Sequence, residues 1–265
     1  MSTGPASFTA VVLRHRQIAQ HIYEMWLSPH PAMVAARPGQ FVHIAVSDTH
    51  DPLLRRPISI CQVNSTGEWS IVYRQQGRGT NLLTKMTPGM QISILGPLGN
   101  GYTWPTTPNG TALLVGGGVG VPPLLFLAQR LKETGWEVKI ALGFLNKEST
   151  ILVDEFCSLG LHVSLATQDG SLGQPGLVLD LLTNTDAVAV YSCGPLPMLQ
   201  AVADWCQEKK LPCQVSLEAR MACGVGACLG CVCQVQHPNN PIPSQERVCR
   251  EGPVFNAEVV FAHAK

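Results

Sequence analysis

The first hundred residues alternate between short apolar runs and turn-forming residues such as Pro38-Gly39 and Pro88-Gly89. One short segment, residues 81–85, has a helical pattern. Six short strands joined by turns are typical of a small antiparallel barrel, which is the fold we predict for this part. The six predicted strands cover residues 8–13, 21–27, 40–46, 57–63, 69–74 and 90–95.

From residue 111 the pattern changes to apolar strands that alternate with helices of about ten residues. This alternation indicates a doubly wound parallel sheet. Glycine-rich turns follow two of the strands, at the edge where such sheets bind ligands. Strands are predicted at 112–115, 137–144, 161–167, 187–192 and 213–217. Helices are predicted at 122–131, 150–159 and 196–209, with a short helix or turn at 176–182.

The chain from residue 218 onward follows neither pattern. It is rich in cysteine and glycine, then in proline, and finally weakly extended. A segment this small buries little core, so a metal centre would supply the missing stability. We therefore divide the chain into a barrel domain at 1–103, an α/β domain at 104–217 and a small subdomain at 218–265.

Composition and charge narrow the class of protein. Apolar residues make up 45% of the 265 residues and charged residues 14%, a balance typical of packed proteins rather than disordered ones. Eighteen basic and eighteen acidic side chains cancel, and aromatic residues make up only 6%. We therefore expect no nucleic-acid partner.

One long stretch, residues 103–129, carries no charge. Glycines and prolines between residues 116 and 123 interrupt it, so we interpret it as a strand, a turn and a helix rather than a membrane span. The N-terminal sequence has no basic region followed by an apolar one, and no secretory signal is expected. We expect a cytoplasmic protein.

Clustered cysteines in a reducing compartment indicate metal or redox chemistry more often than disulfides. Five of the ten cysteines fall between residues 223 and 249. Four, two and seventeen residues separate Cys223, Cys228, Cys231 and Cys249. The pattern C-x4-C-x2-C…C is the plant-type [2Fe–2S] spacing. A four-cysteine zinc site is the alternative, although zinc favours paired C-x2-C units.

The residues around these cysteines suit an iron–sulfur centre. Gly224, Gly226 and Gly230 let the loop turn tightly and aim backbone N–H groups at sulfur. Cys233 would point away from the cluster if a strand follows Cys231, so we interpret it as a buried thiol. A one-electron centre needs a donor and an acceptor, so the rest of the chain should hold a redox cofactor.

The barrel carries signals for a flavin. Arg56 and Ser59 are three residues apart at the start of a strand, with Pro57 fixing the chain between them. A guanidinium suits a diphosphate and a hydroxyl can bond the flavin ring. Gly79 and Thr80 follow in a glycine turn, and we expect Thr80 at a helix N-cap, where backbone N–H groups bind phosphate. Alone, the arginine pattern also fits a solvated surface pair, and the Gly79-Thr80 pattern also fits an ordinary helix cap. The occurrence of both patterns in this order within one barrel is a more specific signal for a flavin.

A nucleotide signal lies in the α/β part. Gly116, Gly117 and Gly118 stand between a predicted strand and helix, where glycine lets a diphosphate approach the helix N-terminus. The triplet is not a G-x-G-x-x-G fingerprint, and a tight turn is the alternative. Arg130 lies too far into the helix to meet a 2′-phosphate, which favours NAD over NADP.

Several motifs in collinear order resemble the ferredoxin–NADP reductase superfamily. They are Arg56-Pro57-Ile58-Ser59, the G-P-L-G-N-G run at 96–101, the G-G-G-V-G run at 116–120 and Cys193-Gly194-Pro195. With the C-G-x-G-x-C-x-x-C loop and the ending at 248–255, nearly the whole chain is similar to the electron transfer subunits of NAD-linked, class 1B dihydroorotate dehydrogenases.

The resemblance implies a site for each cofactor, with FAD on the barrel, NAD on the α/β domain and a [2Fe–2S] cluster on the last subdomain. FAD would contact Arg56, Pro57, Ile58, Ser59, Val72, Tyr73, Arg74, Gly79 and Thr80. NAD would lie against Gly116, Gly117, Gly118, Cys193, Gly194 and Pro195, with Cys193 near the nicotinamide. The cluster would be held by Cys223, Cys228, Cys231 and Cys249. The cofactors carry the chemistry, so no catalytic acid or base is expected.

The resemblance further implies an electron relay for de novo pyrimidine (UMP) synthesis. Electrons from the FMN of a separate dihydroorotate-oxidising subunit would enter at the cluster, pass singly to FAD and leave as a hydride to NAD+. A heterotetramer with two copies of each subunit is expected. Two alternatives stay open: a related reductase subunit with a glutamate-synthase-like or sulfide-linked partner, and a cluster-binding module without catalysis.

Overall fold

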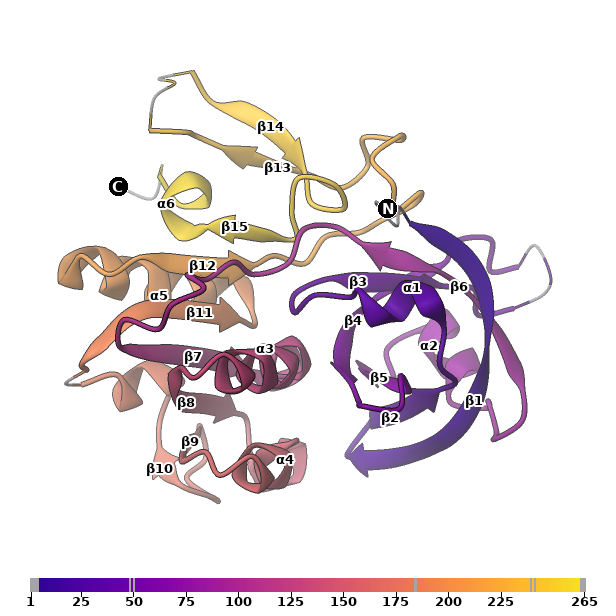
Figure 1. Ribbon diagram of the computed structural model, residues 1–265, viewed down its shortest axis with the longest axis horizontal. Coiled ribbons are helices and arrows are strands. Elements are labelled where there is room, and N and C mark those ends of the chain that lie inside the picture. The colour runs from indigo at the N-terminus through magenta and orange to yellow at the C-terminus, as the bar shows by residue number, and fades with distance from the viewer. Residues whose placement is uncertain are drawn as a thin grey trace.

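The computed structural model describes residues 5–47, 49, 51–183, 185–238, 240 and 242–262. An N-terminal barrel lies beside an α/β sheet, and the C-terminal strands pack against both (Figure 1). Within the described part of the chain, no helix has the length and apolar character needed to span a bilayer.

Six antiparallel strands close into a barrel in the order β1-β2-β5-β4-β3-β6, which confirms the predicted barrel. Alternate side chains, such as Val42 and Ile44, fill its interior together with Trp69 and Ile71. The strands are β1 (Ala6–Ala19), β2 (Ile22–Leu27), β3 (Phe41–Ile44), β4 (Arg56–Val63), β5 (Trp69–Arg74) and β6 (Gln91–Leu98).

Two short helices accompany the barrel. Helix α2 (Arg78–Leu83) begins three residues before the predicted segment, because Gly77, with φ of 83°, already turns the chain into the helix. Helix α1 (Pro31–Val34) was not predicted, since four residues are too few to show a helical period.

The second half is a sheet in the order β10-β9-β8-β7-β11-β12-β15. The strands from β7 to β12 pair in parallel, as predicted. They are β7 (Thr111–Gly117), β8 (Glu137–Phe144), β9 (Val163–Thr167), β10 (Gln174–Pro175), β11 (Ala187–Cys193) and β12 (Cys213–Ser216). The two-residue β10 was not predicted, because it is too short to show an alternating pattern.

Helices cover both faces of this sheet, so its central strands are buried on both sides. Ala112 and Leu114 of β7 face one apolar core, and Leu113 and Val115 face the other. Helices α3 (Pro122–Glu133) and α4 (Val153–Ser158) cover the first face; α5 (Leu196–Lys209) and the 3₁₀ helix η3 (Val178–Leu181) cover the second. Two further 3₁₀ turns are η1 (Gly118–Gly120) and η2 (Lys147–Ser149).

Helix α3 joins the two halves. It lies between the sheet and the barrel (Figure 1), and its Phe126 packs into the barrel core. Gln129 Nε2 donates a hydrogen bond of 2.9 Å to Gln62 Oε1 of β4.

The C-terminal part forms a hairpin of β13 (Val232–Val235) and β14 (Ser244–Arg247), then β15 (Val254–Asn256) and α6 (Ala257–Val260). Strand β15 pairs antiparallel with β12, so the sheet is mixed at this edge rather than wholly parallel. An added strand covers the edge of a sheet that would otherwise expose unpaired backbone groups. The division at 1–103, 104–217 and 218–265 stays a prediction.

Candidate functional site: a cavity between barrel and sheet, and a cysteine loop

A cavity of about 290 Å³ lies where the barrel, the sheet and the start of the C-terminal part meet. Its volume is close to the lower end of the range for small-molecule sites. Cys193, from the predicted nucleotide set, lies in the same wall as the flavin set. Eight of the nine residues predicted to contact flavin line it: Arg56, Pro57, Ile58, Ser59, Val72, Tyr73, Arg74 and Thr80.

The ninth residue, Gly79, makes room for Arg56. A Cβ atom at Gly79 would lie 2.3 Å from Nε of Arg56, so a larger residue would displace the guanidinium from the first turn of α2. Arg55, which precedes Arg56 in the chain, stabilises the barrel instead. Arg55 Nη1 donates to the backbone oxygen of Ser93 at 2.9 Å, and Nη2 donates to Ser93 Oγ at 2.8 Å. Only the second arginine of the pair therefore lines the cavity.

The prediction that Thr80 is the N-cap of α2 is wrong, because the cap is Gly77 and Thr80 is the third helical residue. The Thr80 hydroxyl accepts a hydrogen bond of 2.6 Å from the Gln76 N–H and donates to the Gly77 oxygen at 3.2 Å. It thereby closes the turn before the helix while still lining the cavity.

Strand β5 contributes Tyr73 and Arg74. The Tyr73 hydroxyl and His15 Nε2 are hydrogen-bonded at 2.8 Å, and burial raises the pKa of Tyr73 above its usual value of 10. A Cβ atom at Gly118 would lie 3.7 Å from Nη2 of Arg74. The end of β5 therefore reaches the glycine turn of the predicted nucleotide site.

The two predicted nucleotide loops pack directly against each other. A Cβ atom at Gly120 would lie 2.5 Å from the Cys193 carbonyl carbon, so glycine permits this contact. Cys193 is 4% exposed, and burial raises the pKa of its thiol to about 12. Gly117 and Gly194 both lie against the Met198 side chain, and Pro195 is the N-cap of α5.

The structure changes the expected role of the glycine triplet. Strand β7 continues through Gly117, and a Cβ atom on Gly116 would meet core side chains at 3.0 Å, so that glycine serves packing. Helix α3 begins with Pro122 and Pro123, which have no N–H, and the Leu124 N–H already donates to Val121. The start of α3 is thus a poor phosphate site, and donors for a diphosphate would have to come from residues 118–120.

Part of the cavity wall was not predicted from the sequence. Glu218, Ala219 and Met221, together with Phe41 of β3 and Gln76, line the cavity. The first three directly follow β12 at the same sheet edge as the glycine turns, which is the signal that could have identified them.

The cysteine loop follows these residues. Cys231 and Cys249 are buried, whereas Cys228 is exposed and Cys223 is partly so. The Gly226 N–H donates to Cys249 Sγ at 3.1 Å, and the Cys249 N–H donates to Cys231 Sγ at 3.4 Å. N–H groups aimed at sulfur stabilise thiolates, the form that binds iron. At Cys249, burial and the neighbouring Cys231 outweigh the Gly226 N–H and raise the pKa of the thiol to about 12.

Electrostatics favour a thiolate at one of these positions. Burial opposes ionisation of Cys223, but the N–H groups of Val225 and Cys228, among others, outweigh it and lower the pKa of the thiol to about 6. In the described residues, no three cysteine, histidine or acidic side chains converge on one metal position. Three of the cysteines lie in the loop between β12 and β13, and Cys249 follows β14. They nevertheless suit an iron–sulfur centre by their donor chemistry and by the N–H groups aimed at Cys249 and Cys231. Cys233, the fifth, was expected to be a buried thiol but is only partly buried; this partial burial raises its pKa to about 11.

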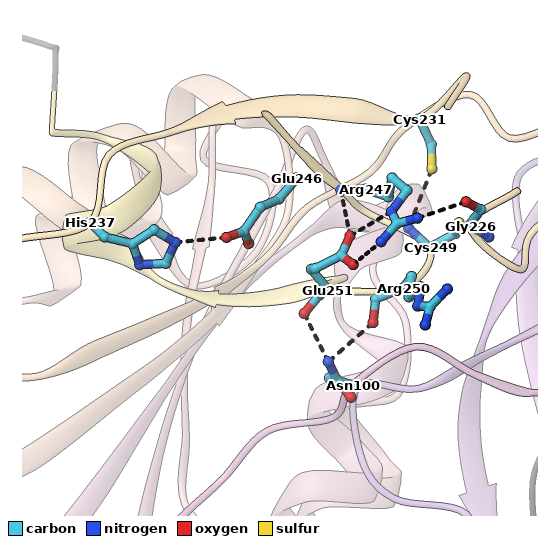
Figure 2. Close-up of polar contacts among 9 residues, drawn as sticks. All are labelled: Asn100, Gly226, Cys231, His237, Glu246, Arg247, Cys249, Arg250 and Glu251. Atoms are coloured by element: carbon cyan, nitrogen blue, oxygen red, sulfur yellow. Dashed lines mark hydrogen bonds and ion pairs between the residues drawn. The ribbon is translucent and has the colours of Figure 1, made fainter. Parts of the chain in front are cut away.

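Arg247 and Glu251 clamp this loop (Figure 2). Arg247 Nη1 donates to the Gly226 oxygen at 2.9 Å, while its Nε donates to Glu251 Oε2 at 2.9 Å and Nη2 pairs with Oε1. Asn100 Nδ2 holds the next turn by donating to the Arg250 and Glu251 oxygens at 3.1 and 2.9 Å. The clamp ties the cysteine loop to the end of the barrel and was not identified from the sequence.

The barrel has a cavity lined by the residues predicted to contact flavin, the parallel sheet has glycine turns at one end, and a cysteine loop follows. Together these features define the class of flavin- and nucleotide-dependent reductases with an iron–sulfur segment. A solved NADH-dependent reduced ferredoxin-NADP oxidoreductase, studied for electron bifurcation, has a TM-score of 0.82 and 29% identity over 95% of this chain and 89% of its own. Residues 218–261 match the family model described as the iron–sulfur cluster binding domain of dihydroorotate dehydrogenase B.

Curated relatives narrow the family further. The chain is 45% identical to the dihydroorotate dehydrogenase B (NAD(+)) electron transfer subunit of Geobacillus thermodenitrificans, over 94% of this chain and 97% of that protein. It is 46% identical to the protein of the same name from Geobacillus sp. strain WCH70, with the same coverage. The chain belongs to the family of electron transfer subunits of NAD-dependent dihydroorotate dehydrogenase B. This confirms the resemblance seen in its motifs.

Proposed function

We propose that this chain carries electrons from the FMN of a dihydroorotate-oxidising subunit through a [2Fe–2S] cluster and FAD to NAD+, in de novo pyrimidine synthesis. The observation that carries the proposal is the shared cavity. One cavity is lined by residues of β4 and β5 that are predicted to contact FAD, by Cys193 at the predicted nucleotide site, and by Met221 beside the cysteine loop. A relay needs this proximity, because each cofactor must exchange electrons with the next.

The barrel residues would hold and orient FAD. Arg56, lying against the first turn of α2, is suited to the diphosphate, and Ser59 is suited to the flavin ring. The Tyr73 phenol stays neutral and can pack on the ring, while its hydroxyl donates to His15 Nε2, because His15 Nδ1 donates to the Met86 oxygen. When bound, the flavin supplies the exchange between single electrons from the cluster and a hydride for the nucleotide.

The nucleotide would bind over the glycine turns at the sheet edge. Residues 118–120 lie beside Cys193, so a nicotinamide placed here would face the flavin cavity. The raised pKa of Cys193 keeps it a neutral thiol, which adds no negative charge beside the ring. The four cysteines Cys223, Cys228, Cys231 and Cys249 would hold the cluster.

The surface of the cysteine loop supports a docked partner. Val225, Leu229 and Val232 are 41%, 62% and 39% exposed beside the predicted cluster ligands. Exposed apolar side chains grouped in this way are typical of protein interfaces. We propose that the FMN-containing catalytic subunit covers them, in a cytoplasmic heterotetramer with two copies of each subunit.

The proposal is tested with purified protein, alone and with a dihydroorotate-oxidising subunit. Alone, the chain should contain FAD, iron and sulfide, and should reduce a dye with NADH but not oxidise dihydroorotate. Together, the two should form a stable complex that reduces NAD+ with dihydroorotate. Iron-free protein, or a complex that fails to reduce NAD+, would contradict the relay. Efficient coupling to a glutamate-synthase-like or sulfide-oxidising partner instead would support the alternative.

A further inference from the structure

His43 is a fully buried histidine on β3, with 0% of its surface exposed. Its neighbours Val42 and Ile44 point into the barrel core. Because side chains alternate along a strand, His43 points out of the barrel, on the same face as Phe41, which lines the flavin cavity. The histidine therefore lies outside the barrel yet beneath other parts of the chain.

The part of the chain that covers His43 is the cysteine loop. A Cβ atom on Gly224 would lie 2.6 Å from Nδ1 of His43 and 3.2 Å from its Cε1. Gly224 has a φ of 71°, so both its conformation and the closeness of the imidazole favour glycine. The imidazole thus touches the backbone directly after Cys223, the first predicted cluster ligand.

The other side of His43 faces the flavin strand. In the β3–β4 pairing His43 is opposite Pro57, which lines the flavin cavity. The His43 carbonyl accepts a hydrogen bond of 3.2 Å from Arg55 Nη1, which fixes the strand at this point. His43 therefore bridges the flavin wall and the cysteine loop.

Neither ring nitrogen makes a hydrogen bond of normal geometry within the described residues, although both are buried and the backbones of Arg55 and Cys223 lie beside the ring. Such groups are rare, because an unpaired buried donor loses its interaction with water without replacement. A leucine would fill similar space without this penalty, so packing alone does not explain a histidine here.

We propose that His43 is a positioning residue for the iron–sulfur centre, donating its ring N–H to a sulfur atom on the Cys223 side of the bound cluster. This inference rests on the proposed function, since it requires the cluster. A hydrogen bond to sulfur favours the more negatively charged, reduced form of the centre and so raises its potential. His43 would therefore help to set the potential at which electrons pass toward the flavin.

The test uses the full-length protein made with ¹⁵N-labelled histidine, reduced anaerobically and examined by pulsed electron paramagnetic resonance. We expect a ¹⁵N coupling to the reduced cluster that disappears in His43→Leu and His43→Gln. His30→Gln is the matched control, because the His30 side chain caps α1 and stacks on Phe8 of β1. It should keep the coupling.

The potential gives a second readout. His43→Leu removes the donor, so the equilibrium constant for one-electron reduction of the cluster should fall about tenfold. This corresponds to a reduction potential about 59 mV lower. His43→Gln keeps an N–H donor and should restore most of that difference. If His43→Leu fails to assemble a cluster, the glutamine variant still reports the loss of the ¹⁵N coupling.

The outcomes separate the two proposals. A wild-type protein without an iron–sulfur signal would refute both the proposed function and this inference. A normal cluster signal with no ¹⁵N coupling, or with a coupling that persists in both His43 variants, would refute only the role of His43.

Discussion

Glu251→Gln should loosen the cysteine loop, because this carboxylate holds the arginine that braces it. The Arg247 backbone N–H and Nε donate to Glu251 Oε2 at 2.8 and 2.9 Å, and Nη2 pairs with Oε1. The hydrogen bond from Arg247 holds the pKa of Glu251 at about 2. Glutamine removes the charge and one acceptor oxygen, but it can still accept from one donor.

The magnitude follows from the exposure of the pair. Hydrogen bonds to charged groups contribute about 1.5–3 kcal/mol when buried. The two side chains are 26% and 30% exposed, so solvent screening reduces the effect, and we expect a loss of about 1–2 kcal/mol in the free energy of loop opening. This corresponds to a loop that opens about 5–30 times more often.

The assay is anaerobic iron release to an excess of chelator, followed by absorbance. Glu246→Gln is the matched control, since Glu246 lies in β14 next to Arg247 but pairs with His237 at 2.6 Å instead of bracing the loop (Figure 2). We expect iron release to accelerate about 5–30-fold in Glu251→Gln and to stay near the wild-type rate in Glu246→Gln. Equal rates in the two variants would refute the bracing role of Glu251.

Three further predictions concern the cofactors and one thiol. Arg56→Ala should lower the FAD content of the purified protein about tenfold. Arg78→Ala, at a surface arginine that pairs with Asp51, is the control and should keep the wild-type FAD content. Unaltered flavin content in Arg56→Ala would remove Arg56 from the site. Cys228→Ser should abolish the cluster and electron entry from the partner but leave part of the NADH-to-dye activity, whereas Cys157→Ser should affect neither; equal loss of both activities would contradict separate roles. Because burial raises the pKa of Cys193 from 9.0 to about 12, its contribution to stability should be complete below pH 9 and lost as the pH rises toward 12. The unfolding midpoint of Cys193→Ala should therefore fall less steeply with pH above pH 9 than that of the wild-type protein. Parallel curves of midpoint against pH for the two proteins would contradict this prediction.

Much of the site was predictable where local sequence carries the chemistry. The Arg56–Ser59 and Tyr73-Arg74 motifs were expected at the flavin and now line one cavity. Thr80 was placed wrongly within its helix, because the start of α2 depends on the backbone of Gly77, and a short turn has no periodicity to reveal it. The first turn of α3 was expected to bind phosphate, but its two prolines remove the donors that this role needs.

The sequence by itself determined the alternation of strands and helices, the barrel, the parallel sheet and the spacing of the four cysteines. These features depend on neighbouring residues, through side-chain periodicity and turn chemistry, so they can be read along the chain. Only the tertiary structure decided that Glu218 lines the cavity between barrel and sheet, that Glu251 holds Arg247 and that His43 lies against Gly224. The contacts of Glu218 and His43 join segments that are far apart in the chain. Glu251 lies in a turn that is held by Asn100, which follows barrel strand β6. Such contacts follow from the packing of the barrel, the sheet and the tail together, which no local pattern specifies.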